Sequence, residues 1–295
     1  MRIVYHLGAH CTDDERLLRC LLKNRGKLAP QGITVPGPTR YRNLMRDTAI
    51  ALKGQAASAD TQALVLEQIV EQDRSERLVL SWDSFLCFLP WVMDGGLYMA
   101  AGDRTRAFTQ VFPSMQAEFH LAIRNPATFL PAVFAKQAPM KGGKPRYEDF
   151  VRGVDIFALR WSQVVTAILA QNPGVPLTVW CDEDTPLIWP EVLQAVAGFA
   201  PGTVLEDEDD LLTSLMPPEG MTRMRAYIEN HPVTSVEMRR RIVSAFLDKF
   251  ALPEKINVDV ELPGWTEETA RRLTESYEED VARIAQMRGV RLLAP

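Results

Sequence analysis

The sequence IVYHLGAHCTDDERLL, residues 3–18, changes character at Gly8. Before this glycine a short apolar run predicts a strand. After a loop, leucines recur at helical spacing over residues 17–22, and Gly26 closes the pattern. A strand, a glycine turn and a helix in this order are typical of the opening of an α/β sheet.

Three further short apolar runs are each flanked by helical stretches, as buried parallel strands are. One flanking stripe steps by three or four residues and predicts a helix of five turns with core-facing side chains: Phe150, Val154, Phe157, Trp161, Val165 and Ile168. We therefore expect an α/β fold with an open, doubly wound, mostly parallel sheet and flanking helices. Its adjacent strands are predicted at residues 3–8, 77–81, 117–123 and 176–180.

The chain has 295 residues, a formal net charge of −5 and ordinary globular composition, which excludes collagen-like, coiled-coil and disordered classes. An acidic total is not typical of a general nucleic-acid binder. The longest apolar run, residues 85–93, is too short to span a bilayer, and the N-terminal run is too short for a signal peptide. Four cysteines without a CxxC pair favour reduced thiols over a zinc cluster. We expect a cytoplasmic protein without a metal, nucleic-acid or membrane partner.

The composition changes at the acidic run 206–210. This run is either a cation site or a solvated loop at a domain edge, and the absence of glycine or spaced ligands favours the loop. Beyond it the patterns predict helices only. We expect an α/β domain over residues 1–205 and a helical extension over 206–295 that packs on it.

Two helix starts are predicted in this extension. Thr234 and Glu237 have the spacing of a capping box, before a helix with inward-facing Met238, Ile242, Phe246 and Phe250. Thr266 is the predicted cap of a last helix, which Gly289 closes.

The loop after the first strand is the first place to look for chemistry, because ligands bind at the carboxyl ends of strands in doubly wound sheets. A strand, loop and helix suit an anion site, since unpaired N–H groups and the helix dipole point at the loop. A phosphate-binding loop normally adds a lysine and further glycines. Here Asp13, Asp14 and Glu15 occupy the turn instead, and acids in a first turn stabilise a helix by about 0.3–1 kcal/mol each.

Residues 3–33 resemble the opening of bacterial-type sulfotransferases, whose pattern is roughly H-[LI]-G-x-x-K-[TS]-G-T-T-x-L. His6, Leu7, Gly8, Thr12 and Leu17 agree with it. The resemblance extends over about residues 3–200 and implies a P-loop NTPase-like fold. It also implies the sulfuryl donor 3′-phosphoadenosine 5′-phosphosulfate as cofactor, and a small-molecule or glycan acceptor.

A second motif, HLAIRNP at residues 120–126, resembles the strand of that family that ends in R-[DN]-P. By resemblance, Arg124 holds the 3′-phosphate of the donor. The backbone of Gly8, Ala9, His10, Cys11 and Thr12 then holds the 5′-phosphosulfate. From its chemistry alone, Arg124 suits either bidentate phosphate recognition or a surface salt bridge.

The chain also departs from the family pattern. Cys11 stands where the family has lysine, and Ala132 where it has a serine for the 3′-phosphate. At an effective dielectric near 20, a carboxylate about 6 Å from a phosphate oxygen adds about 3 kcal/mol of repulsion. His10 is a candidate general base, or else a histidine that hydrogen-bonds a neighbouring loop.

Three functions stay open on these grounds. The chain is a sulfotransferase-like enzyme, or a non-catalytic relative that binds a small molecule, glycan or protein. The third is an enzyme with a changed donor, held through a divalent cation. The missing lysine, the acidic loop and Ala132 favour the non-catalytic relative.

Overall fold

The computed structural model describes residues 1–71, 74–137, 146–256 and 262–295. Its centre is a six-stranded sheet in the order β2-β3-β1-β4-β5-β6, with every neighbouring pair parallel. The strands are β1 (Arg2–His6), β2 (Ile33–Thr34), β3 (Arg77–Ser81), β4 (Gln116–Ile123), β5 (Leu177–Cys181) and β6 (Val290–Leu293). The four predicted strands are confirmed as adjacent parallel strands, with ends that differ by one or two residues.

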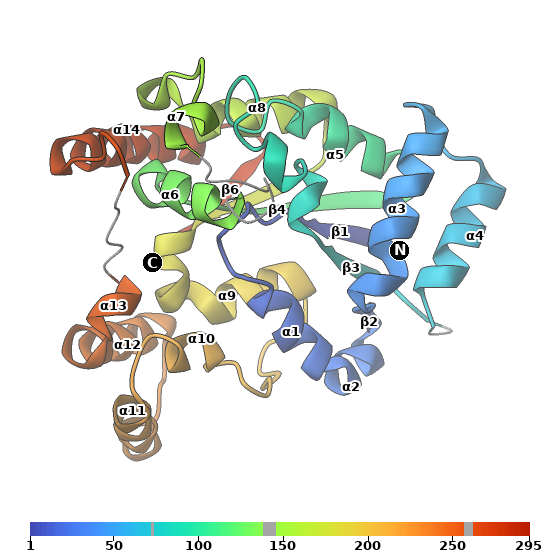
Figure 1. The fold of residues 1–295 in the computed structure, drawn as a ribbon. Coiled ribbons are helices and arrows are strands. Elements are labelled where there is room, and N and C mark those ends of the chain that lie inside the picture. Colours follow the sequence, from blue (N-terminus) through green and yellow to red (C-terminus); the bar gives the residue numbers. More distant parts are fainter. Residues whose placement is uncertain (72–73, 138–145, 257–261) are drawn as a thin grey trace.

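Helices cover both faces of the sheet (Figure 1). Along each strand alternate side chains enter opposite cores, so Tyr5 faces one core and Val4 the other. The larger core lies under α3 (Pro38–Leu52), α4 (Ala59–Ile69), α5 (Ala101–Thr109), α6 (Pro126–Gln137), α7 (Tyr147–Phe150), α8 (Trp161–Gln171) and α14 (Glu267–Ala285). The smaller core lies under α1 (Arg16–Lys23), α2 (Arg25–Leu28) and α9 (Thr185–Ala197).

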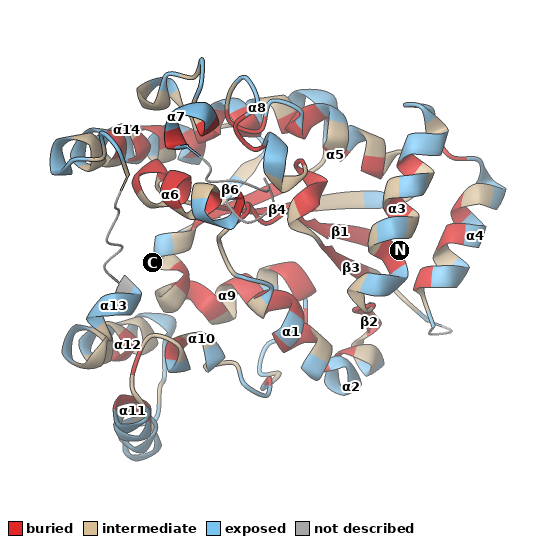
Figure 2. Ribbon diagram, viewed as in Figure 1, coloured by how far each residue is buried: buried red, intermediate tan, exposed pale blue. Residues whose placement is uncertain are grey.

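A third, smaller cluster of buried apolar side chains holds the helices after the acidic run together. These are α10 (Asp210–Thr213), α11 (Pro218–Asn230) and α12 (Val236–Phe250), which α13 (Pro253–Ile256) follows. The acidic run lies at the surface, where Lys23 pairs with Asp207 and Lys27 with Glu206. Figure 2 shows that α11 is largely exposed, in contrast to the buried sheet.

The predicted five-turn helix over residues 150–168 is wrong. α7 ends at Phe150 and α8 begins at Trp161. Between them Gly153 has a φ of +76°, and Arg160 is extended. Val154 still packs against the core across this break. In the 3-10 turn Ile156–Ala158 the core contact comes from Ile156, while the Phe157 ring lies under the Arg272 guanidinium.

Two expectations for the C-terminal segment also need correction. β6 pairs with β5, so the part of the chain after residue 206 contains a strand and not helices only. The cap of α12 is Ser235, whose hydroxyl accepts from the Met238 N–H at 3.1 Å, and not Thr234. The predicted cap of α14 is confirmed, since the Thr266 hydroxyl accepts from the Thr269 N–H at 3.1 Å. That helix ends at Ala285, before Gly289.

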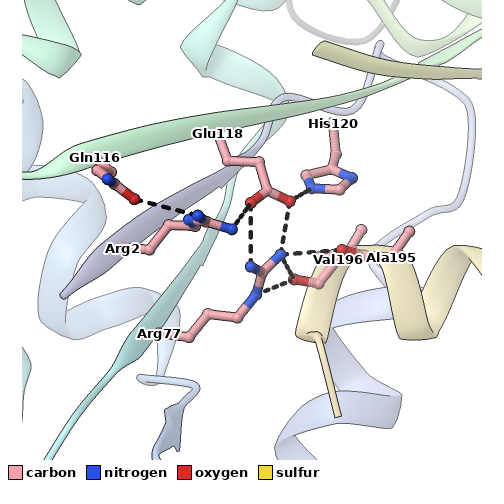
Figure 3. Close-up of polar contacts among 7 residues, drawn as sticks. All are labelled: Arg2, Arg77, Gln116, Glu118, His120, Ala195 and Val196. Atoms are coloured by element: carbon pink, nitrogen blue, oxygen red, sulfur yellow. Dashed lines mark hydrogen bonds and ion pairs between the residues drawn. The ribbon is translucent and has the colours of Figure 1, made fainter. Parts of the chain in front are cut away.

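A half-buried ionic network lies under α9 (Figure 3). Two guanidinium nitrogens of Arg77 donate to the two carboxylate oxygens of Glu118, at 2.7 and 3.1 Å, and the His120 ring donates to the same carboxylate at 2.7 Å. Arg77 also donates to the carbonyls of Ala195 and Val196 in the last turn of α9. The network therefore ties two central strands to the C-terminal end of one helix.

We predict that Glu118→Gln destabilises the protein by about 3 kcal/mol at pH 7, because it leaves Arg77 without its counter-charge. Burial raises the pKa of Glu118, but the hydrogen bonds from His120 and Arg77 outweigh this and lower it from its usual 4.5 to about 2. The stability from the ionised carboxylate is therefore present above pH 4.5 and is lost as the pH falls towards 2.

Urea unfolding at pH 7 and pH 3 measures both effects. The difference between wild type and variant should shrink at the lower pH. Glu278→Gln, on the exposed side of α14, is the matched control and should leave stability unchanged within about 0.5 kcal/mol. An equal loss at both pH values would show that the charge of Glu118 does not matter.

Candidate functional site

The candidate site lies at the carboxyl edge of the sheet, where β1 and β4 are neighbours. From β1 the chain continues towards β2 and β3, whereas from β4 it continues towards β5 on the other side. This divergence is the topological switch point at which doubly wound folds form a ligand crevice. The loop over residues 7–15, Arg124 and the turn after β5 meet there.

The loop after β1 makes a series of tight turns. Gly8 has a φ of +41°, and Cys11, Asp14 and Glu15 also have positive φ values, at 60°, 48° and 64°. Non-glycine residues rarely adopt this conformation. As a result α1 begins only at Arg16, so Asp13, Asp14 and Glu15 precede the helix and do not form its first turn as expected.

Asp13 closes the N-terminus of α1. Its two carboxylate oxygens accept from the backbone N–H of Glu15 at 3.2 Å and of Leu17 at 3.1 Å. The capping role expected of the acidic run thus falls to Asp13, while Glu15 pairs with Arg42 at 2.6 Å. The free amides that would attract an anion at a helix N-terminus are in this way partly satisfied by the chain itself.

His10, the candidate base, is 2% exposed, and its ring is engaged. Nδ1 lies 2.8 Å from the Tyr98 hydroxyl, which also accepts from the His10 backbone N–H. Nε2 lies 3.7 Å from a carboxylate oxygen of Asp83. The ring stacks on Tyr98 with a centroid distance of 5.9 Å. These contacts correspond to the structural role weighed for His10.

Cys11 lies in the turn with its thiol in the protonated form. Burial raises its pKa to about 11, and Lys136 and Arg124 only partly oppose this. A thiol in this form is a poor nucleophile at neutral pH.

Arg124 lies beside the loop, at the end of β4. Its guanidinium donates to the Cys11 carbonyl at 2.5 Å and to the Thr128 hydroxyl at 3.0 Å. It therefore holds the loop, and neither contact is a salt bridge to a surface carboxylate. Ala132, two turns further along α6, is half-buried.

A cavity of about 480 Å³ opens in front of Arg124 and is here named the loop cavity. Its polar wall comes from the loop, β4, the turn after β5 and the ends of neighbouring helices: Thr12, Asp13, Asp14, Arg16, Arg124, Thr128, Asp182, Glu183, Thr185, Ser244, Asp248 and Lys255. Its apolar wall is Pro186, Leu187, Trp189, Leu211, Leu215 and Leu247. Carboxylates outnumber cations in this lining.

Asp182 and Glu183 are functional candidates that the sequence interpretation did not select. Burial raises the pKa of Asp182 to about 7, with smaller contributions from nearby carboxylates and against the effect of Arg124. Glu183 is fixed in place, since its oxygens accept from the Asn125 N–H at 2.7 Å and the Tyr277 hydroxyl at 3.1 Å. The acidic triplet after the fourth predicted strand was the available signal.

A second, small cavity of about 40 Å³ lies beneath the loop. It is lined by residues of the loop and by side chains from distant parts of the chain: Gly8, Ala9, Cys11, Thr12, Asp13, Asp14, Glu15, His6, Arg42, Ser81, Asp83 and Lys136. Lys136 and Arg42 bring positive charge to this cavity, which Cys11 cannot. Four carboxylates line it as well, and one of them, Glu15, is paired with Arg42. The local sequence around Lys136 or Arg42 does not predict that either residue lies beside the loop.

Comparison with family models, with curated proteins and with solved structures found no match. In the described ranges, no group of three or more His, Cys, Asp or Glu side chains is arranged to hold a metal ion. None of the helices described has the length and apolar character needed to cross a membrane. The four cysteines are unpaired.

The three buried histidines generate a prediction on pH. Burial lowers the pKa of His6, His10 and His120 below 6.5, so each is neutral when folded and gains a proton more easily when unfolded. The free energy of unfolding should therefore fall as the pH drops below 6.5, by about 1 kcal/mol per histidine and pH unit until the folded-state pKa is reached.

Urea unfolding at pH 7.5, 6.5 and 5.5 measures this slope. His120→Gln should reduce it, whereas His231→Gln, at an exposed position after α11, should not. The same slope in all three proteins would contradict the prediction.

Proposed function

We propose that this chain is a non-catalytic relative of the sulfotransferases that binds a small molecule carrying amine and hydroxyl groups in the loop cavity. The observation that carries this proposal is the position of the Asp13 carboxylate on the N–H groups of Glu15 and Leu17. A donor phosphate at this helix terminus would have to displace Asp13 and face its charge.

The electrostatics of the loop cavity favour a cationic group over an anionic one. Asp13, Asp14 and Asp182 line one side, and each carboxylate attracts an amine and repels a phosphate by a comparable amount. Arg124 already donates to the Cys11 carbonyl and the Thr128 hydroxyl. Arg16, which also lines the loop cavity, donates to the Ser214 hydroxyl.

The shape of the loop cavity suits a small ligand. Its volume of about 480 Å³ lies in the usual range for small-molecule sites, which combine apolar walls with a few placed polar groups. Trp189 and Leu247 offer an apolar surface to the carbon skeleton. The Thr12 hydroxyl donates to the Ala9 carbonyl at 2.8 Å, so towards a ligand it can serve as an acceptor for an amine or hydroxyl donor.

Sulfuryl transfer from 3′-phosphoadenosine 5′-phosphosulfate is the second candidate function. Lys136 and Arg42 favour it, because they line the small cavity beneath the loop and bring positive charge to the turn. A cation that stabilises charge on transferring oxygens is what such a reaction needs. Arg42 is however paired with Glu15.

The nucleotide product adenosine 3′,5′-bisphosphate distinguishes the two functions. We predict no saturable heat when wild type is titrated with it, because Asp13 and its neighbours repel it. The variant Asp13→Asn, Asp14→Asn, Glu15→Gln keeps side chains of the same shape, changes the charge by +3 and releases Arg42. It should gain measurable affinity by calorimetry.

The matched control Glu229→Gln, Glu278→Gln, Glu279→Gln makes the same charge change on exposed positions of α11 and α14 and should stay silent. Micromolar binding of adenosine 3′,5′-bisphosphate by wild type would instead favour sulfuryl transfer over the non-catalytic function. If the loop variant folds but does not bind this nucleotide, the resemblance to sulfotransferases would concern the fold alone and not the binding site.

A matched pair of ligands tests the preference for amines. Glucamine (1-amino-1-deoxysorbitol) should raise the melting temperature, and sorbitol, which lacks the amine, should raise it less. Because the pKa of Asp182 is about 7, its charge and the glucamine effect should increase from pH 6 to pH 8.

Asp182→Asn should remove most of the glucamine effect and its pH dependence, measured by thermal unfolding. Asp94→Asn, at an exposed position, is the control and should preserve both. Equal shifts with glucamine and sorbitol would argue against amine recognition.

A further inference from the structure

A groove between α11 and α12 has no part in the loop cavity or in the proposed function. It has a volume of about 560 Å³, and its floor is apolar: Tyr227, Met238, Ile242, Ala245, Phe246 and Phe250. The sequence pattern predicts inward-facing side chains at four of these positions. Only Ile242 is buried, while Met238, Phe246 and Phe250 are half-buried and Tyr227 is 42% exposed.

Close packing of the two helices fixes this floor. A Cβ atom added to Gly220 of α11 would lie 2.8 Å from the Cβ of Phe250, so the helices approach each other here as only glycine allows. Phe246 stacks on Phe250 at a centroid distance of 5.8 Å and contacts Tyr227 at 5.9 Å. The aromatic rings therefore support one another along the groove.

Cations form the rim of the groove. Arg223, Arg241 and Lys249 line it, and none of its lining residues among the described part of the chain is a carboxylate. Arg223 and Lys249 lie over the Phe250 ring, at 5.6 and 5.4 Å from its centroid. Arg223 also pairs with Glu219 at 2.6 Å, one turn before it on α11. The rim stays positive beside an apolar floor.

We propose that this groove binds a single-chain amphiphile with an anionic headgroup, such as a fatty acid, as a free monomer. The apolar floor takes the chain, and Arg241 and Lys249 take the headgroup. The volume lies in the usual range for small-ligand sites. The charge of the rim selects the sign of the headgroup.

Calorimetric titration with dodecanoate below its micelle concentration tests the proposal. We expect saturable binding of about one molecule per chain. Dodecyltrimethylammonium, with the same chain and a cationic headgroup, should bind at least tenfold more weakly. Equal affinity for the two, or no dodecanoate binding, would overturn the proposal.

Two variants locate the ligand. Ala245→Trp fills the groove from an exposed helical position, and Arg241→Glu with Lys249→Glu reverses the rim charge; each should weaken dodecanoate binding about tenfold. Arg283→Glu, on an exposed position of α14, should not. Unchanged binding by folded groove variants would overturn the assignment.

Titrations with anionic vesicles and with an acidic amphipathic peptide test whether the groove binds a membrane surface or a protein instead. Binding of anionic vesicles without binding of monomeric dodecanoate would overturn the proposal in favour of a membrane surface. Binding of an acidic amphipathic peptide that dodecanoate does not displace would overturn it in favour of a protein partner.

Discussion

The ion pair between Arg77 and Glu118 is the interaction on which the arrangement of the site depends. Arg77 donates to both Glu118 oxygens on β4 and to the last carbonyls of α9, where a cation also suits the helix dipole. The other end of α9 begins at Thr185, beside Asp182 in the loop cavity. A helix anchored at one end by a half-buried ion pair therefore sets the position of one wall of the loop cavity.

The central strands are predictable because each is a short apolar run that must be buried on both faces. β2 and β6 are not predicted in this way. β2 is only two residues long, and β6 is a half-buried edge strand that contains the charged Arg291. The helix predicted over residues 150–168 fails for another reason. Apolar spacing predicts which side chains enter the core but not whether a helix is continuous. Here Gly153 and the short 3-10 turn Ile156–Ala158 separate the two helices.

For the candidate site, the sequence predicts which residues lie at the carboxyl edge of the sheet, but not which side chains they contact. The rule for parallel sheets places residues 8–12 and Arg124 at one edge, and the hydrogen bond from Arg124 to the Cys11 carbonyl brings them together. The orientation of the His10 ring depends on Tyr98, 88 residues away in the sequence. Lys136 reaches the loop from α6. These contacts depend on how the helices pack against one another, and a local sequence pattern does not predict that packing.

The self-capped loop explains how an acidic turn is accommodated at the N-terminus of α1. A helix N-terminus offers N–H groups and a partial positive charge to any nearby acceptor. An external phosphate loses translational and rotational entropy when it binds. Asp13 avoids this loss because it is part of the chain, two residues before Glu15. With Asp13 in place the terminus is partly satisfied, and the loop cavity keeps the charges of Asp14 in the turn and of the half-buried Asp182 after β5. The same loop geometry that elsewhere serves an anion then presents a surface suited to an amine.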